Sequence, residues 1–172
     1  MDNYRLSIIE WAIKTHNDVN QKYNGEPYSF HLESVANNVR IFGENEFSTE
    51  VYENLIVSAY CHDLIEDARI TYGDLKSKAG EYIADIVYLL TDELGKTRRE
   101  RILRTYPMIS EVREARFLKC CDVLANTNFS KITGHSMYKK YKSEYPIFRA
   151  IIRVEGEFSE LWSNLDAVNE FR

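Results

Sequence analysis

The sequence predicts an all-α fold, a compact multi-helix bundle that forms a single domain over residues 1–172. Apolar residues recur at steps of three and four through most of the chain, which is the spacing of one face of an α-helix. The period-two alternation of a half-buried strand is not sustained anywhere. Hydrophobic residues make up 44 % of the sequence and charged residues 28 %, so the chain can bury a core without disulfide bonds.

The first predicted helix covers residues 4–16, and a loop follows over 17–30. The buried stripe of this helix contains Leu6, Ile9, Ile13 and His16. The loop is predicted because Asn, Gly and Pro gather there, and because Pro27 disfavours helical backbone at the preceding residue.

The second and third helices carry their own start and stop signals. The second is predicted over 31–42, and it ends at Gly43, which we assign as its C′ glycine. Ser48 or Thr49 caps the third helix, because a hydroxyl at this position accepts a hydrogen bond from a free backbone N–H. We expect this third helix to be long and to reach Asp67.

Further helices are predicted up to the end of the chain. Thr71 and Asp74 have the spacing of a capping box, which opens a short helix that Gly80 interrupts. A polar, basic loop follows the next helix, and Pro146 lies near the start of the last one. These helices are predicted over 72–78, 81–91, 110–126 and about 146–171.

Composition excludes several classes of protein. The net charge of −5 argues against a general nucleic-acid binder, which presents a net basic face. No stretch approaches the ~18 apolar residues of a membrane span, and the N-terminus lacks the features of a signal peptide. The three cysteines have no metal-binding spacing and are expected to be reduced core thiols. We expect a cytoplasmic protein that does not bind membranes; the sequence leaves homo-oligomer formation open.

Ionisable residues interrupt the apolar stripe of the third helix. At 100° per residue, the stripe that contains Ala59 continues through His62 and Glu66, with Asp63 and Asp67 on its shoulder. Carboxylates buried there without partners would destabilise the fold by several kcal/mol or shift their pKa values. A bound cation removes this penalty, because it supplies the missing charge.

The helix over 110–126 repeats the pattern, since Asp122 takes a position where its stripe predicts an apolar residue. A lone His on a helix is more often a satisfied core or surface residue than a ligand. Here, however, two imidazoles and two carboxylates come from three predicted helices. Mixed nitrogen and oxygen donors suit Mn, Fe, Co or Zn. The candidate metal ligands are His31, His62, Asp63 and Asp122.

These residues and their surroundings resemble the HD phosphohydrolase superfamily, and within it the small alarmone hydrolases related to the hydrolase half of the RelA/SpoT enzymes. The resemblance covers about residues 5–150. It is carried by the stretches A-I-K-T-H-N-D-V-N-Q-K-Y-N-G-E-P-Y-S-F-H, C-H-D-L-I-E-D-A-R-I-T, L-T-D-E-L-G-K-T-R-R-E-R and L-K-C-C-D-V-L-A-N-T. The Glu-Asp pair after His-Asp distinguishes this branch from many other HD enzymes.

The resemblance implies a guanosine-3′,5′-bis(diphosphate) 3′-pyrophosphohydrolase with one divalent ion, typically Mn²⁺, on the four candidate ligands. It implies that Glu66 and Asp67 form the acid/base pair. It also implies that Asn126 contacts the nucleotide and that Tyr145 lies near the nucleotide-binding tyrosine. The sequence departs from the family pattern where Lys22 is followed by Tyr rather than by a second basic residue.

Substrate contacts are expected from basic and aromatic side chains. Arg98 and Arg101 belong to a basic run that can bind phosphate, and Lys22 is a further candidate, although such runs are more often solvated faces. Tyr28 and Tyr145 can stack on a base, although tyrosines in a chain so rich in aromatic rings are more often core residues.

Other functions remain open from the sequence. One is a phosphohydrolase of another nucleotide, acting on the 2′-phosphate of NADPH, on a deoxynucleotide or on a signalling nucleotide. Another is a non-catalytic HD module that binds a nucleotide or a protein, which the presence of Glu66 and Asp67 argues against. A purely structural helical domain would leave the interrupted stripes unexplained.

Overall fold

Helices hold nearly all regular structure in the computed structural model, which describes residues 1–171, and the all-α prediction is confirmed. The elements are α1 (Asn3–Asp18), β1 (Lys22–Tyr23), β2 (Glu26–Pro27), α2 (Ser29–Gly43), α3 (Thr49–Cys61), α4 (Leu64–Asp67), α5 (Tyr72–Ala79), α6 (Glu81–Leu90), α7 (Arg98–Ser110), α8 (Arg113–Ile132), α9 (Met137–Ile152) and α10 (Ser159–Val168). None of the helices in these residues has the length and apolar character that crossing a membrane requires.

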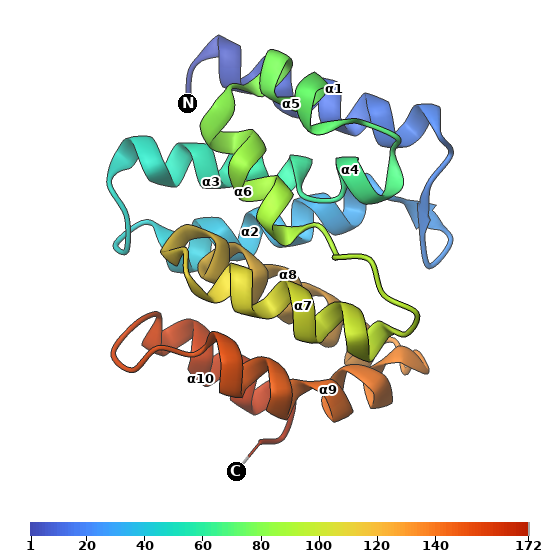
Figure 1. Ribbon diagram of the computed structural model, residues 1–172, viewed down its shortest axis with the longest axis vertical. Coiled ribbons are helices and arrows are strands. Elements are labelled where there is room, and N and C mark those ends of the chain that lie inside the picture. Colours follow the sequence, from blue (N-terminus) through green and yellow to red (C-terminus); the bar gives the residue numbers. More distant parts are fainter. Residues whose placement is uncertain (172) are drawn as a thin grey trace.

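The helices form successive layers between the two termini (Figure 1). At one end α1 packs against α3, and at the other end α9 and α10 cover α8. α8 also packs against α2, so it joins the N-terminal and C-terminal parts of the bundle. Its inward side chains, among them Phe117, Leu118 and Cys121, are fully buried. Most of the hydrophobic stripes that the sequence predicts therefore meet in one core.

The stripe predicted for the first helix is wrong in part. Leu6 is 46 % exposed, and α1 turns Ile8 and Ala12 into the core together with His16.

Several helix ends form as their local sequence predicts. The Ser48 side chain accepts a hydrogen bond from the Val51 N–H at the start of α3. Thr71 and Asp74 form the predicted capping box at the start of α5. Gly80 separates α5 from α6 with a φ of +87°, a conformation that side chains with a Cβ rarely adopt.

The third helix is shorter than predicted. α3 ends at Cys61, and Asp63 has φ −103° and ψ 4°, outside the helical region, before the short helix α4 begins. In one continuous helix, His62 and Asp63 would point about 100° apart. The break instead lets both side chains turn towards the same point, so the prediction of one helix reaching Asp67 was wrong.

Gly43 has a different role from the predicted one. It lies inside α2, and Glu44 continues with right-handed helical angles, so no left-handed C′ residue ends this helix. A Cβ on Gly43 would lie 3.2 Å from the Phe117 ring and 3.3 Å from Tyr52. The glycine therefore permits close packing of α2.

Replacing Gly43 with valine should lower the free energy of unfolding by about 1–3 kcal/mol, because the added methyl groups would overpack this contact. Gly73→Val is the matched control: a Cβ there meets only Thr71 Oγ1, at 3.7 Å. The control should change stability by no more than about 0.5 kcal/mol. Urea denaturation measures the free energy of unfolding of both variants. Equal stability of the two variants would contradict the packing role of Gly43.

The last predicted helix is also wrong in its extent. Pro146 lies in the interior of α9, and residues 153–158 separate this helix from α10. Phe158, at the end of this connection, has a φ of +50° and is buried. The helix predicted over 110–126 begins at Arg113 and extends to Ile132.

Candidate metal centre and its cavity

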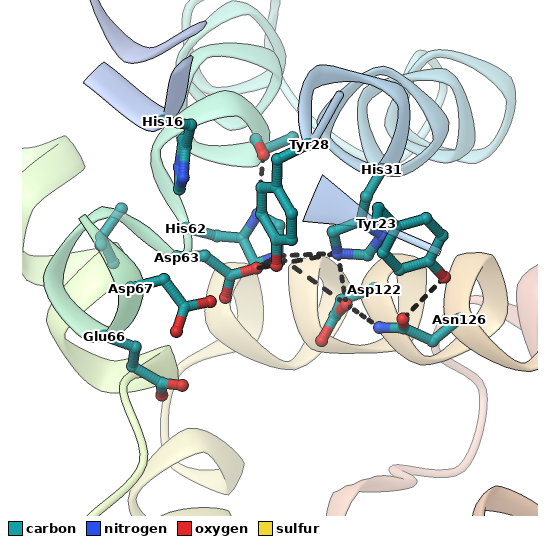
Figure 2. Close-up of polar contacts among 12 residues, drawn as sticks. His16, Tyr23, Tyr28, His31, His62, Asp63, Glu66, Asp67, Asp122 and Asn126 are labelled. Carbon is teal, nitrogen blue, oxygen red and sulfur yellow. Dashed lines mark hydrogen bonds and ion pairs between the residues drawn. The ribbon is translucent and has the colours of Figure 1, made fainter. Parts of the chain in front are cut away.

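The four candidate metal ligands converge from three parts of the fold (Figure 2). His31 comes from α2, His62 and Asp63 from the turn after α3, and Asp122 from α8. The two Nε2 atoms are 3.3 Å apart. Asp63 Oδ2 lies 2.9 Å from His62 Nε2, and Asp122 Oδ1 lies 3.4 Å from His31 Nε2. We call these four residues the four-donor cluster.

The donor set fits a divalent ion. Ligand atoms at about 2.1 Å from one ion lie roughly 3.0–3.4 Å from each other, close to the separations observed here. His31, His62 and Asp63 offer atoms that all lie within 4.8 Å of one another. Asp122 is outside that group of three, although its Oδ1 lies within 3.8 Å of both Nε2 atoms. His62 Nδ1–H donates to the Ala59 carbonyl at 2.8 Å, which leaves its Nε2 lone pair for the cluster when the ring is neutral.

Opposite charges control the protonation of the cluster. Burial by itself would lower the pKa of His62, but Asp63, with help from Asp122, raises this pKa to about 9. Burial opposes ionisation of Asp63 as well, yet His62 holds the pKa of that carboxyl below its usual range. The two carboxylates thus require a neighbouring positive charge, which a proton on His62 or a bound cation provides.

Side chains around the cluster orient its carboxylates. Lys119 Nζ donates to Asp122 Oδ2 at 3.0 Å, and Asn126 Nδ2 donates to Asp122 Oδ1 at 2.6 Å. The Tyr28 hydroxyl donates to Asp63 Oδ2. Such second contacts fix the direction of ligand lone pairs.

Sequence reasoning missed Tyr23, which lies on the hairpin β1–β2. Its ring stacks on His31 with centroids 4.8 Å apart, and its hydroxyl donates to Asn126 Oδ1 at 3.0 Å. The Asn24-Gly25 pair could have indicated this hairpin, because both residues have positive φ, as a type I′ turn requires.

Glu66 and Asp67 lie on α4, beside the four-donor cluster (Figure 2). Glu66 Oε1 accepts a hydrogen bond from the Asp92 N–H, and Asp67 Oδ2 accepts one from Gln21 Nε2 at 2.6 Å. Both side chains reach solvent, but the surrounding protein desolvates them enough to raise the pKa of each above its usual value. A raised pKa is suited to proton transfer near neutral pH.

The cluster opens into a cavity of about 280 Å³, near the lower end of ligand-pocket volumes. The cavity is lined by ionisable and aromatic side chains from both parts of the bundle. They are Tyr23, Tyr28, His31, Asp63, Glu66, Asp67, Asp92, Arg98, Tyr106, Lys119, Asp122, Asn126, Tyr141, Glu144, Tyr145 and Phe148, together with Ile102 and Val123.

Four of the six expected substrate contacts line this cavity, and two do not. Tyr28 and Asn126 face the cluster. Arg98 lies opposite Glu144, and Tyr145 contributes its ring while its hydroxyl donates to Asp166 at 2.5 Å. Lys22 is exposed on β1, and Arg101 pairs with Asp92 at 3.1 Å outside the lining. Their roles in binding stay predictions.

Comparison with known proteins places the chain among HD-domain proteins. No family model matches it. It is 33 % identical over 125 residues to the guanosine-3′,5′-bis(diphosphate) 3′-pyrophosphohydrolase MESH1 of Danio rerio, a match that spans 70 % of this chain and 66 % of that protein, just under two thirds.

Solved structures agree on the fold. A metazoan orthologue of SpoT, described as hydrolysing ppGpp, superposes with a TM-score of 0.81 over 99 % of this chain and 96 % of its own, at 19 % identity. The Listeria monocytogenes protein lmo0812 gives a TM-score of 0.64 at 22 % identity, over 86 % of this chain and 99 % of its own. With the resemblance in sequence, the chain belongs to the HD-domain, alarmone hydrolase-like proteins.

Proposed function

We propose that this protein is a metal-dependent phosphohydrolase whose substrate is guanosine-3′,5′-bis(diphosphate), which it converts to GDP and pyrophosphate. One observation carries the proposal. Two buried imidazoles and two carboxylates converge beside Glu66 and Asp67 at the wall of a cavity. The activities named for the Danio rerio relative and the metazoan orthologue support it.

His31, His62, Asp63 and Asp122 would hold the ion, and Mn²⁺ is the metal we propose, with Zn, Fe and Co as alternatives for this donor set. A bound divalent ion supplies Lewis-acid activation of water and neutralises charge on phosphoryl oxygens. Tyr28 holds Asp63, and Asn126 and Lys119 hold Asp122, so the chain itself fixes the donors before any ion binds.

In the proposed reaction, water adds to the phosphorus bonded to the ribose 3′ oxygen, and the bond between that phosphorus and the 3′ oxygen breaks. Glu66 accepts the proton of the attacking water, because its raised pKa keeps it a competent base near neutral pH. Asp67, on the same short helix, orients the water or returns a proton to the 3′ oxygen. The products are GDP with a free 3′ hydroxyl and pyrophosphate.

A second candidate is hydrolysis of a less highly charged nucleotide at the same site, such as the 2′-phosphate of NADPH. The pairing of charges in the cavity favours this candidate. Lys119 already pairs with Asp122, and Arg98 pairs with Glu144, so both cations that line the cavity also face a carboxylate. A substrate with four phosphates must compete with these pairs.

Phosphate release by the Mn²⁺-loaded protein distinguishes the candidates. We expect pyrophosphate from guanosine-3′,5′-bis(diphosphate) and loss of turnover when a chelator removes the metal. Orthophosphate from NADPH, or triphosphate from a deoxynucleotide, would keep the site and change the substrate. One bound metal per chain without turnover of any of these nucleotides would contradict an enzymatic role and favour a nucleotide-binding module.

A further inference from the structure

A buried histidine outside the four-donor cluster is connected to Asp67. His16 lies in the last turn of α1 and is fully buried. Its Nδ1 lies 2.5 Å from Gln21 Oε1, and Gln21 Nε2 lies 2.6 Å from Asp67 Oδ2. Gln21, in the segment between α1 and β1, therefore bridges the interior of the fold and the candidate acid/base residue (Figure 2 shows His16 and Asp67).

The direction of both hydrogen bonds is determined by chemistry. A carboxylate only accepts hydrogen bonds, so the amide group of Gln21 must present its N–H to Asp67. Its amide oxygen then faces His16, which must donate from Nδ1–H. Burial lowers the pKa of His16, which favours a neutral ring with a single N–H. A reversed amide would place its oxygen against the carboxylate oxygen of Asp67 and lose that hydrogen bond.

The fold holds His16 rigidly in this place. Its ring packs against Tyr28 with centroids 4.9 Å apart, and Tyr28 itself donates to Asp63 of the cluster. His16 Nε2 is buried and has no hydrogen-bond partner within residues 1–171. An unsatisfied buried nitrogen destabilises a protein, so an apolar side chain would suit the core better at this position. Its contact with Gln21 offers a reason for a histidine here.

Few other contacts fix the orientation of the Asp67 side chain. It is the last residue of α4, its side chain reaches solvent, and Arg69 shortly after it has a φ of +60°. Gln21 is its only side-chain hydrogen-bond partner among the described residues. Without this bond, the Asp67 carboxylate would be free to populate other rotamers, many of them directed away from the cavity.

We propose that His16 and Gln21 are positioning residues, which hold the Asp67 carboxylate at the cavity in the orientation that the reaction uses. The role in turnover rests on the proposed function, whereas the hydrogen-bonded chain itself does not. Contacts that orient metal ligands typically change affinity or activity about 10–100-fold when they are lost, and we expect a similar effect for contacts that orient Asp67. The effect should appear in kcat rather than in KM, because His16 and Gln21 do not line the cavity and are not expected to contact the substrate.

Steady-state kinetics tests the role in turnover. Gln21→Met has similar length but lacks the amide, and we expect kcat to fall about 10–100-fold with KM within about twofold. His16→Leu should reduce kcat in the same way, whereas His16→Asn keeps a donor near the position of Nδ1 and should recover most of the loss. Asn17→Ala, an exposed neighbour on α1, is the control and should behave as wild type.

Two kinetic results would overturn the proposal. One is a Gln21→Met variant with wild-type kcat. The other is parallel loss of kcat and melting temperature in both His16 variants, without recovery in His16→Asn, which would assign His16 a structural role only.

Nuclear magnetic resonance tests the chain of hydrogen bonds without any turnover. Gln21 is the only glutamine in the sequence, so a glutamine-labelled sample shows one side-chain amide. We expect its N–H signal to be shifted by the carboxylate and to move in Asp67→Asn, and His16 to carry its proton on Nδ1. If the Gln21 amide signal does not change in Asp67→Asn, the hydrogen bond between Gln21 and Asp67 is refuted. If wild type hydrolyses no nucleotide while these signals appear, the proposed function fails and the structural link stands.

Discussion

Replacing Asp63 with asparagine is expected to abolish metal binding and hydrolysis together. Asp63 Oδ2 lies 2.9 Å from His62 Nε2 and 3.7 Å from His31 Nε2, so this carboxylate is the anionic donor nearest to His62 and also lies close to His31. Asparagine keeps the shape but removes the charge. Metal affinity should fall by more than the ~10–100-fold that is typical when only a supporting contact around a metal is lost.

Equilibrium dialysis with metal analysis gives the number of ions per chain, and thermal unfolding gives an independent measurement. Mn²⁺ should raise the melting temperature of wild type, because a ligand that binds only the folded state stabilises it. Mn²⁺ should leave the melting temperature of Asp63→Asn unchanged. Asp85→Asn, at an exposed position on α6, is the matched control and should respond as wild type. Full metal occupancy in Asp63→Asn would show that the ion binds elsewhere.

The sequence predicted the four-donor cluster because the ionisable residues interrupt apolar stripes on helices. His62 and Asp122 are among the buried residues, at positions where helical periodicity calls for apolar side chains. Such a pattern can be recognised without knowing the fold, because burial of unpaired charge is unfavourable in any arrangement. It required only the apolar period of each helix, since His62 was identified although the third helix was predicted too long.

The details that were missed depend on contacts between distant segments. No proline or glycine lies at the break at Asp63. The apolar period therefore predicted one continuous helix through this position. Gly43 is explained by the Phe117 ring of another helix, which no local signal reveals. The link from His16 to Asp67 crosses about fifty residues of sequence, since both hydrogen bonds pass through Gln21.

The direction of the Arg101 side chain could not be predicted from the sequence. Arg101 pairs with Asp92, which lines the cavity, while Arg101 itself is not part of the lining, and its expected phosphate contact stays a prediction. Charged side chains are long and flexible, and their direction is determined by the nearest opposite charge rather than by the sequence around them.

The second large effect is expected from Glu66→Gln, which should lower kcat about 10²–10⁴-fold while metal binding is retained. Glu66 belongs to the rim of the site rather than to the four-donor cluster, so the ion should bind the variant normally. Glutamine can still accept the hydrogen bond from the Asp92 N–H, so α4 should keep its place. Glu111→Gln, on the surface, is the control.

The pH dependence of kcat provides a separate measurement of the same role. Desolvation by the surrounding protein raises the pKa of Glu66 above its usual value, and a base works only when it is deprotonated. The wild-type rate should therefore fall as the pH drops through that raised pKa and reach a plateau above it. Glu66→Gln has no carboxyl to protonate, so its residual rate should lose this acidic limb. If Glu66→Gln keeps the acidic limb of the pH profile and more than about a tenth of wild-type kcat, Glu66 is not the base and Asp67 takes that role.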